Sequence, residues 1–203
     1  MLFCSMHIVP HMTRAVFDAV ITDPPYASGG ASQTAKNRST TEKYSSLRGD
    51  KALPDFDSDQ MDQRSWTRWM CEWLQMVRTA CKPGAPICLF IDWRQLPSMT
   101  DALQWAGWTW RGIAVWDKPS GRPQRGRFRQ QAEFIVWGSN GKMPLERNVG
   151  CLPGGRILDP FAGSGTTILA AVQEGYEAVG IELTDAYFQL GTQRVKQVLE
   201  SQK

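Results

Sequence analysis

The sequence has few of the residues that build metal centres and disulfide frameworks. It contains only two histidines, and its five cysteines are scattered, with no pair at C-x-x-C spacing. This pattern supports neither a zinc site nor a disulfide scaffold. We therefore expect no metal and interpret several of the cysteines as thiols buried in the core. The cysteines are Cys4, Cys71, Cys81, Cys88 and Cys151.

Long apolar runs and a secretion signal are also lacking. No run approaches the ~18–20 apolar residues that a membrane span requires. The N-terminal stretch MLFCSMHIVPHMTR has neither the charged start nor the cleavage site of a signal peptide. The net charge of +3 is too small to indicate a nucleic-acid partner by itself. We therefore expect a cytoplasmic protein that does not bind membranes.

The chain does have the length and composition of one globular domain. Its 203 residues are 42% hydrophobic and 21% charged, which are ordinary fractions, and a chain of this length can bury a sizeable core. It shows no internal repeat, so we expect a single domain over residues 1–203. Nine tryptophans, most of them between Trp66 and Trp137, predict a thick aromatic core in that part of the chain.

Hydrophobic patterning predicts strands that alternate with helices. Short β-branched runs that end in turn signals are typical of buried parallel strands, and apolar residues at helical spacing, as in 65–81, indicate amphipathic helices. The last strand pair before the C-terminal third is expected to form an antiparallel hairpin, which gives an α/β sheet. We expect strands at 16–22, 85–92, 109–119, 132–141, 155–160 and 177–182, and helices at 65–81, 96–108, 166–174 and 185–200.

Two segments have the composition of loops. Residues 27–60 are rich in Ser, Thr, Gly, Lys and Asp without an apolar period, and a loop of this length is usually functional or disordered, so we expect a mobile loop. Residues 118–131 contain five basic residues and no acid, and such a patch attracts phosphates. The basic residues are Lys118, Arg122, Arg125, Arg127 and Arg129.

A glycine turn, DPFAGSGTT at 159–167, follows one of the expected strands. Gly163 and Gly165 let the backbone approach a ligand closely, and the next helix points its N-terminus at that ligand. A phosphate-binding P-loop would need a lysine before the Ser or Thr, and a dinucleotide fingerprint would need a third glycine where Ile168 stands. The reading that remains is a nucleoside ligand without phosphates, S-adenosylmethionine.

An acid at the end of the next strand supports this reading, because it would hold the ribose hydroxyls. Glu182 stands there, 23 residues after Asp159, which is close to the ~20-residue spacing of such acids in related sheets.

The stretch DPPY, at 23–26, ends the first expected strand with two hydrogen-bond acceptors and a flat ring. The prolines fix the backbone so that the Pro24 carbonyl points outward beside the Asp23 carboxylate. Together they can accept both hydrogens of an exocyclic amine on a nucleobase, which frees the lone pair of the nitrogen for attack on a methyl group. Such a base must first be flipped out of the duplex and stacked, here on Tyr26. The alternative is a rigid turn with a buried tyrosine.

These residues together resemble the amino-methylating DNA methyltransferases. DPPY is similar to their catalytic motif, DPFAGSGTT to their cofactor loop and GIEL, at 180–183, to their ribose-binding strand end. The catalytic motif precedes the cofactor motif, which matches the circularly permuted, beta order of motifs in that family. The resemblance implies a Rossmann-like methyltransferase fold of class α/β, with a mostly parallel twisted sheet, one antiparallel hairpin and helices on both faces.

The resemblance also implies roles for individual residues. Asp23, Pro24, Pro25 and Tyr26 would carry methyl transfer. Asp159, Pro160, Phe161, Ala162, Gly163, Ser164, Gly165, Thr166 and Glu182 would contact S-adenosylmethionine. Lys118, Arg122, Arg125, Arg127 and Arg129 would bind DNA phosphates.

Several alternatives stay open at this point. The aspartate in DPPY favours the N6 amine of adenine, whereas cytosine N4 enzymes more often have serine there and are the alternative. A catalytically impaired, DNA-binding relative is a further alternative. Both a monomer and a homodimer are compatible with the sequence.

The chain departs from the family in two places. Residues 3–9 read FCSMHIV where the family usually has a Gly-Asp pair near the cofactor adenine, although they can still form the edge strand. The family also usually carries a His-x-Thr-x-Lys-Pro segment and a helix before the cofactor strand, but here 18 residues, 138–155, run directly to that strand. One face of the sheet would then lack its helix. Either this protein lacks the segment, or residues that belong near 153–155 are absent from the sequence.

Overall fold

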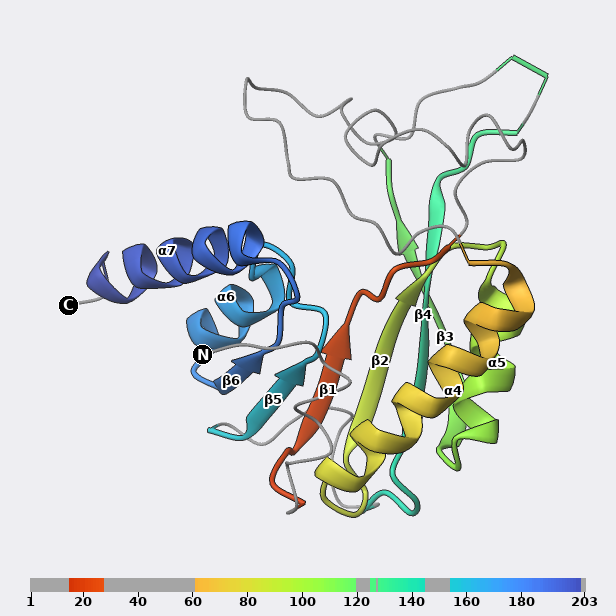
Figure 1. The fold of residues 1–203 in the computed structure, drawn as a ribbon, viewed down its shortest axis with the longest axis horizontal. Helices are drawn as coiled ribbons and strands as arrows, with labels where there is room; N and C mark the ends of the chain where they lie inside the picture. Colours follow the sequence, from red (N-terminus) through yellow and green to blue (C-terminus); the bar gives the residue numbers. More distant parts are fainter. Residues whose placement is uncertain (1–14, 28–60, 120–124, 127, 145–153, 202–203) are drawn as a thin grey trace.

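The computed structural model describes residues 15–27, 61–119, 125–126, 128–144 and 154–201, and these form one six-stranded mixed sheet (Figure 1). The strand order is β3-β4-β2-β1-β5-β6. β4 runs antiparallel to both of its neighbours, and all other pairs are parallel. The strands are β1 (Ala19–Thr22), β2 (Pro86–Ile91), β3 (Thr109–Asp117), β4 (Ala132–Ser139), β5 (Arg156–Asp159) and β6 (Glu177–Gly180).

Four helices of the described ranges accompany this sheet: α4 (Gln63–Ala80), α5 (Leu96–Trp105), α6 (Thr166–Gln173) and α7 (Asp185–Ser201). Figure 1 shows α4 and α5 beside β2, β3 and β4, and α6 and α7 at the other end, beside β5 and β6. The α/β fold with a mostly parallel sheet and one antiparallel hairpin is therefore confirmed.

Helix α4 forms where the sequence places a cap before an amphipathic run. The Asp62 carboxylate accepts hydrogen bonds from the backbone N–H groups of Arg64 and Ser65, at 3.0 and 3.1 Å, which satisfies two of the free donors at the helix start. Its apolar face is buried and contributes more residues to the hydrophobic core than any other described helix or strand. The fully buried side chains of this face are Trp66, Met70, Trp73, Leu74 and Val77.

The expected aromatic core is only partly present. Trp66, Trp73 and Trp108 are buried, with at most 3% of their surface exposed. The expectation is wrong for four other tryptophans: two lie on the edge strand β3, whose residues are largely exposed, one follows β2, and one is the last residue of α5. These exposed tryptophans are Trp93, Trp105, Trp110 and Trp116.

Close packing of α6 against β6 depends on a glycine. A Cβ atom on Gly180 would lie 2.9 Å from both the Ala162 Cβ and the Ile168 Cγ1 atoms, too close for any side chain. Gly180 pairs with Asp159 on β5, so the glycine turn and α6 are held directly against the ends of these two strands.

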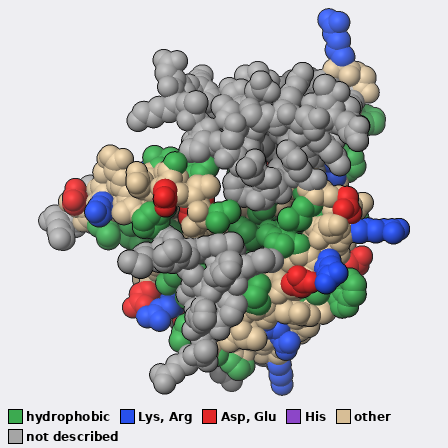
Figure 2. All heavy atoms as spheres, in the orientation of Figure 1, with side chains coloured by type: hydrophobic (Ala, Val, Ile, Leu, Met, Phe, Trp, Pro, Cys, Tyr) green, Lys and Arg blue, Asp and Glu red, His purple; other side chains and the backbone are tan. Residues whose placement is uncertain are grey.

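Several expectations concern residues outside the described ranges. These are the edge strand at 3–9, the loop at 27–60 apart from Ala27, and most of the connection between β4 and β5. On the face drawn in Figure 2, hydrophobic side chains gather across the middle of the molecule. Acidic and basic side chains lie close to one another on its right. Within the described ranges, no helix has both the length and the apolarity to cross a bilayer, and no three His, Cys, Asp or Glu side chains form a group suited to a metal ion.

Candidate active site

The two motifs lie side by side because the strands that carry them are neighbours. β1 and β5 pair in parallel, with Val20 opposite Leu158, so their carboxyl ends meet at one edge of the sheet. The Thr22 hydroxyl donates a 2.6 Å hydrogen bond to the Asp159 carboxylate, which joins residues 137 positions apart. In α/β sheets this edge is where ligands bind. The structure thus brings DPPY and the glycine turn together.

Residues 23–26 follow β1 directly and are held by a hydrogen bond from α4. The Trp66 indole N–H of α4 donates a 2.7 Å hydrogen bond to the Pro25 carbonyl. Pro24 is buried, whereas the Asp23 side chain reaches solvent. Among the described residues, none donates a hydrogen bond to the Pro24 carbonyl. The Asp23 side chain is thus accessible at the strand end, whereas the outward direction of the Pro24 carbonyl stays a prediction.

Tyr26 contacts Asp23 directly, since its hydroxyl donates a hydrogen bond to the carboxylate. The protein around Asp23 raises the pKa of this carboxyl by desolvation, although the Tyr26 hydroxyl and the Lys118 charge oppose that effect. Burial and the neighbouring Asp23 charge raise the pKa of Tyr26 as well, so its hydroxyl stays protonated and remains a donor. A carboxylate with a raised pKa, close to a cofactor-type glycine turn, is typical of functional sites.

Asp159 is the buried centre of this junction, with 2% of its surface exposed. Its carboxylate accepts hydrogen bonds from the Thr22 hydroxyl and from the backbone N–H of Phe161, the latter at 3.1 Å. Burial nevertheless raises the pKa of Asp159 to about 6, against hydrogen bonds from Thr22, Thr167 and Phe161 that lower it. The carboxylate holds both motifs through these hydrogen bonds, but its buried charge lowers the free energy of unfolding.

Replacing Asp159 by asparagine should therefore stabilise the fold at neutral pH. Because the folded state holds a proton on Asp159 more tightly than the unfolded chain does, the free energy of unfolding falls as the pH rises from about 4 to about 6. The asparagine side chain keeps an acceptor oxygen but carries no charge, so we expect a gain of about 2 kcal/mol above pH 6 and no gain near pH 4. Urea unfolding across this pH range measures it.

The exposed Asp101 on α5 offers a matched control. Asp101→Asn should leave the pH dependence of unfolding unchanged. An Asp159→Asn variant that is less stable than the wild type by the same amount at every pH would show instead that the second carboxylate oxygen is an essential hydrogen-bond acceptor.

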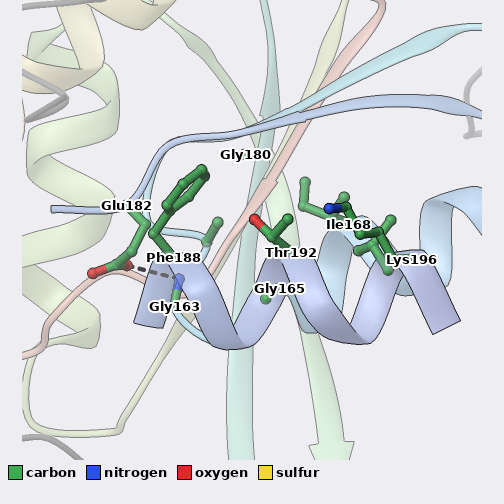
Figure 3. A pocket seen from close by; sticks show the side chains of 11 residues that line it. Gly163, Gly165, Ile168, Gly180, Glu182, Phe188, Thr192 and Lys196 are labelled. Atoms are coloured by element: carbon green, nitrogen blue, oxygen red, sulfur yellow. Dashed lines mark hydrogen bonds between the residues drawn. The ribbon is translucent and has the colours of Figure 1, made fainter. Parts of the chain in front are cut away.

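The glycine turn is hydrogen-bonded to Glu182, which follows β6. The Glu182 carboxylate accepts the Gly163 backbone N–H at 2.9 Å (dashed in Figure 3) and both the backbone N–H and the hydroxyl of Thr184 at 2.9 Å. Glu182 is 8% exposed. A Cβ atom on Gly163 would meet nothing within 4 Å, so space lies open beside the turn.

A pocket of about 230 Å³ lies between this turn and α7. Figure 3 shows Glu182 and Gly163 at one end and Lys196 of α7 at the other, with Phe188 and Thr192 of α7 along it. Four of the residues predicted to bind the cofactor line it, namely Ala162, Gly163, Gly165 and Glu182. The lining is mainly apolar with an acid at one end, which suits an aromatic or aliphatic ligand that carries hydroxyl donors.

Phe161 packs against α4, whereas the glycines that follow it line the pocket beside α7. Its ring packs against Trp69 and Trp73 of α4, at centroid distances of 5.6 and 4.8 Å. These tryptophans, and Trp66 beneath Pro25, support both motifs from one helix, a role that sequence reasoning missed. The spacing of 66, 69 and 73 on one helical face was the available signal.

Arg194 of α7 is a second residue that sequence reasoning missed. Its guanidinium donates to the Ser164 carbonyl at 2.7 Å, to the Ser164 hydroxyl at 2.8 Å and to the Thr166 hydroxyl at 3.4 Å. Two predicted cofactor residues thus have their hydroxyls bound to α7, where they fix the shape of the turn. Nothing in the local sequence connects Arg194 with a turn 30 residues earlier.

The predicted phosphate-binding residues fall into three groups. Lys118 forms an ion pair with Glu133 of β4 and lies 4.6 Å from the centroid of the Trp116 ring. Arg125 and Arg129 are exposed. Arg122 and Arg127 lie outside the described residues.

Comparison with known proteins agrees with this geometry. The model of a DNA methylase family, N6_N4_Mtase, matches residues 17–149 and 145–193. The putative methylase YubD of Escherichia coli K12 is 26% identical over 210 residues, covering 89% of this chain and 82% of that protein. Three type II methyltransferases, among them M.SmaI of Serratia marcescens, are 28–29% identical over 52% of this chain and are matched over about half of their own length.

Solved structures share the fold. The complex of M1.HpyAVI with SAM superposes with a TM-score of 0.67 at 19% identity, covering 95% of this chain and 97% of the other. The cytosine-N4-specific PvuII DNA methyltransferase gives a TM-score of 0.69 at 13% identity, covering 98% and 89%.

The two family matches meet at residues 145–149, in the connection between β4 and β5. An alignment of 210 residues is longer than the whole chain of 203, so YubD contains residues that have no counterpart here. The division of the family match agrees with the expectation of a shortened connection before β5, which stays a prediction. Since the family model matches most of the chain, this protein belongs to the DNA methylase family of N6 and N4 methyltransferases.

Proposed function

We propose that this DNA methylase is a permuted, beta-class enzyme that transfers a methyl group from S-adenosylmethionine to the N6 amine of a flipped adenine in DNA. The observation that carries the proposal is the direct junction of the two motifs: Thr22, next to DPPY, donates a hydrogen bond to Asp159, the first residue of the glycine turn. A cofactor bound to the turn and an amine bound to Asp23 would then lie at the same edge of the sheet.

The residues at the turn suit S-adenosylmethionine. Glu182 is a nearly buried acid at the end of β6, placed to accept hydrogen bonds from ribose hydroxyls. The open space beside Gly163 lets a ligand approach the backbone closely. The turn has no lysine for a phosphate, which agrees with a ligand that has none. When bound, this cofactor supplies a methyl group on a positively charged sulfur.

The catalytic residues act on the amine. Asp23 and the Pro24 carbonyl accept its two hydrogens, so that the nitrogen lone pair is released from the ring and directed at the methyl carbon. The negative charge of Asp23 stabilises the positive charge that the nitrogen gains as the bond forms, and the carboxylate is placed to take up the proton that the nitrogen then loses. Tyr26 holds this carboxylate in position through its hydroxyl.

Binding of DNA is assigned to the basic segment 118–131, which joins β3 to β4. Arg125 and Arg129 are exposed, which supports phosphate contacts, and Arg122 and Arg127 are proposed for the same role.

Product analysis tests the choice of base. The protein is incubated with labelled S-adenosylmethionine and unmethylated DNA, and the digested nucleosides are separated and identified by mass spectrometry. We expect N6-methyladenine, because an aspartate stands at the first position of DPPY. N4-methylcytosine would establish the alternative, which the structural likeness to the PvuII enzyme keeps open. Cofactor binding without any labelled base would favour an impaired, DNA-binding relative.

A further inference from the structure

The hairpin of β3 and β4 brings two opposite charges to the edge of the sheet where β1 ends. Lys118 follows β3, Glu133 lies at the start of β4, and their side chains form an ion pair. The next residue of β4, Phe134, pairs with Ile91 at the end of β2. Since β1 is the neighbour of β2, two strand spacings of ~4.8 Å separate β4, which carries Glu133, from the strand that precedes Asp23, and three separate β3, which precedes Lys118.

The pair is held in a partly buried setting. The Lys118 backbone N–H donates to the Gln131 carbonyl at 2.7 Å, which continues the hairpin ladder. The Lys118 ammonium lies over the Trp116 ring, and that ring meets the Phe90 ring edge-on at 5.7 Å. Only 36% of the lysine side chain and 27% of the glutamate side chain are exposed. Charges in such a setting act over longer distances than charges in bulk water do.

The two charges act on Asp23 in opposite directions. Desolvation by the surrounding protein raises the pKa of Asp23 most, and the hydrogen bond from Tyr26 lowers it; after these two effects, Glu133 raises the pKa and Lys118 lowers it. Glu133 also raises the pKa of Tyr26, the hydrogen-bond donor to Asp23. The other ionisable groups around these side chains are Asp92, which acts on Tyr26, and Asp159, which is affected by Asp23.

We propose that Lys118 and Glu133 are positioning residues for methyl transfer, a neutral pair in which each charge cancels the effect of the other on the Asp23 carboxylate. This inference rests on the proposed function of Asp23. It gives Lys118 a role at the reacting edge instead of on the DNA phosphates. Lys118 without Glu133 would draw the Asp23 carboxylate away from the amine, and Glu133 without Lys118 would hold a proton on it.

Single and double variants of the pair test the proposal through the pH profile of single-turnover methyl transfer. The acidic limb is the low-pH part of the profile, where the rate rises as Asp23 loses its proton. In Lys118→Met the uncompensated glutamate should move this limb to higher pH by about half a unit, so the rate at a given pH on the limb should be about threefold lower. In Glu133→Gln the uncompensated lysine should move the limb to lower pH. The double variant should return close to the wild type, and Lys118→Arg, which keeps the charge, should resemble the wild type throughout.

Several results would overturn the proposal. If the ion pair is purely structural, both single variants should keep the acidic limb of the wild type, or should lose rate equally at every pH. A phosphate contact at Lys118 would raise the KM for DNA and flatten the salt dependence of binding by about one unit, with the acidic limb unchanged. Circular dichroism and thermal unfolding of each variant verify that the chains compared are folded. Asp23→Asn distinguishes a failure of the proposed function from a failure of this inference. If Asp23→Asn stays active, the proposed role of Asp23 is wrong. If Asp23→Asn is inactive but the Lys118 and Glu133 variants keep the wild-type pH profile, only the Lys118–Glu133 proposal is wrong.

Discussion

Replacing Asp23 by asparagine is expected to lower the single-turnover rate of methyl transfer by about 10³-fold. Asparagine preserves the size of the side chain but removes the negative charge that would stabilise the developing ammonium. Its NH₂ group also donates hydrogen bonds at a position where the two amine hydrogens need acceptors. Transfer of labelled methyl groups to DNA, with the enzyme in excess over its sites, measures the chemical step directly.

The same substitution should leave the fold and cofactor binding intact. The Asp23 side chain reaches solvent, and its hydrogen-bond donor among the described side chains is the Tyr26 hydroxyl. Because the protein raises the pKa of Asp23, the folded state gains nothing from the charge, and its removal does not destabilise the chain. Thermal unfolding and calorimetric titration with S-adenosylmethionine should both match the wild type.

Asp18, immediately before β1, provides the matched control at the opposite end of the strand. Its carboxylate accepts hydrogen bonds from Lys82 Nζ at 2.7 Å and from the Arg156 backbone N–H at 2.9 Å. Burial tends to raise the pKa of Asp18, but these contacts outweigh burial and lower it. Asp18→Asn should therefore reduce the free energy of unfolding by about 1 kcal/mol and leave the rate per folded molecule unchanged. Equal losses of activity in the two variants would contradict a specific role for Asp23.

Local patterning was sufficient to predict the secondary structure. The helix expected at 65–81 lies at Gln63–Ala80, and the hairpin expected at 109–119 and 132–141 lies at Thr109–Asp117 and Ala132–Ser139. These segments were predictable because propensity, periodicity and turn residues all favour the same state. The error of two residues at the start of α4 reflects the Asp62 cap, a recognisable signal that was not used.

Contacts between distant segments were not predictable in the same way. The resemblance placed DPPY and the glycine turn in one site, but the bond that joins them, from Thr22 to Asp159, depends on which strands become neighbours. The exposure of Trp116 and the pairing of Lys118 with Glu133 depend likewise on β3 being the edge strand. The sequence of the basic loop predicts a phosphate contact for Lys118, and it gives no sign of the ion pair with an acid 15 positions later.

Replacing Gly163 by valine is expected to weaken S-adenosylmethionine binding at least 100-fold, or about 2.7 kcal/mol, with a much smaller loss of stability. Gly163 has a φ of +51°, and a Cβ atom there would meet no protein atom within 4 Å. The space that it would enter is the open side of the turn, next to the Gly163 N–H that bonds to Glu182. A bulky side chain would thus fill the position proposed for the cofactor rather than disturb the core. Calorimetric titration measures the affinity.

Gly175 provides the comparison that isolates this effect. Its φ of +78° also lies in the left-handed region, and a Cβ atom there likewise meets nothing within 4 Å, but it lies beyond the far end of α6. Valine should therefore impose a similar backbone strain of about 1–2 kcal/mol at both positions, and only Gly163→Val should lose the cofactor. At Gly165 a Cβ atom would lie 3.2 Å from the Gly191 Cα atom, so Gly165→Val should unfold more easily than either. If Gly163→Val and Gly175→Val bind S-adenosylmethionine equally well, the cofactor does not lie against this turn, and the methyl donor must be placed elsewhere on the sheet edge.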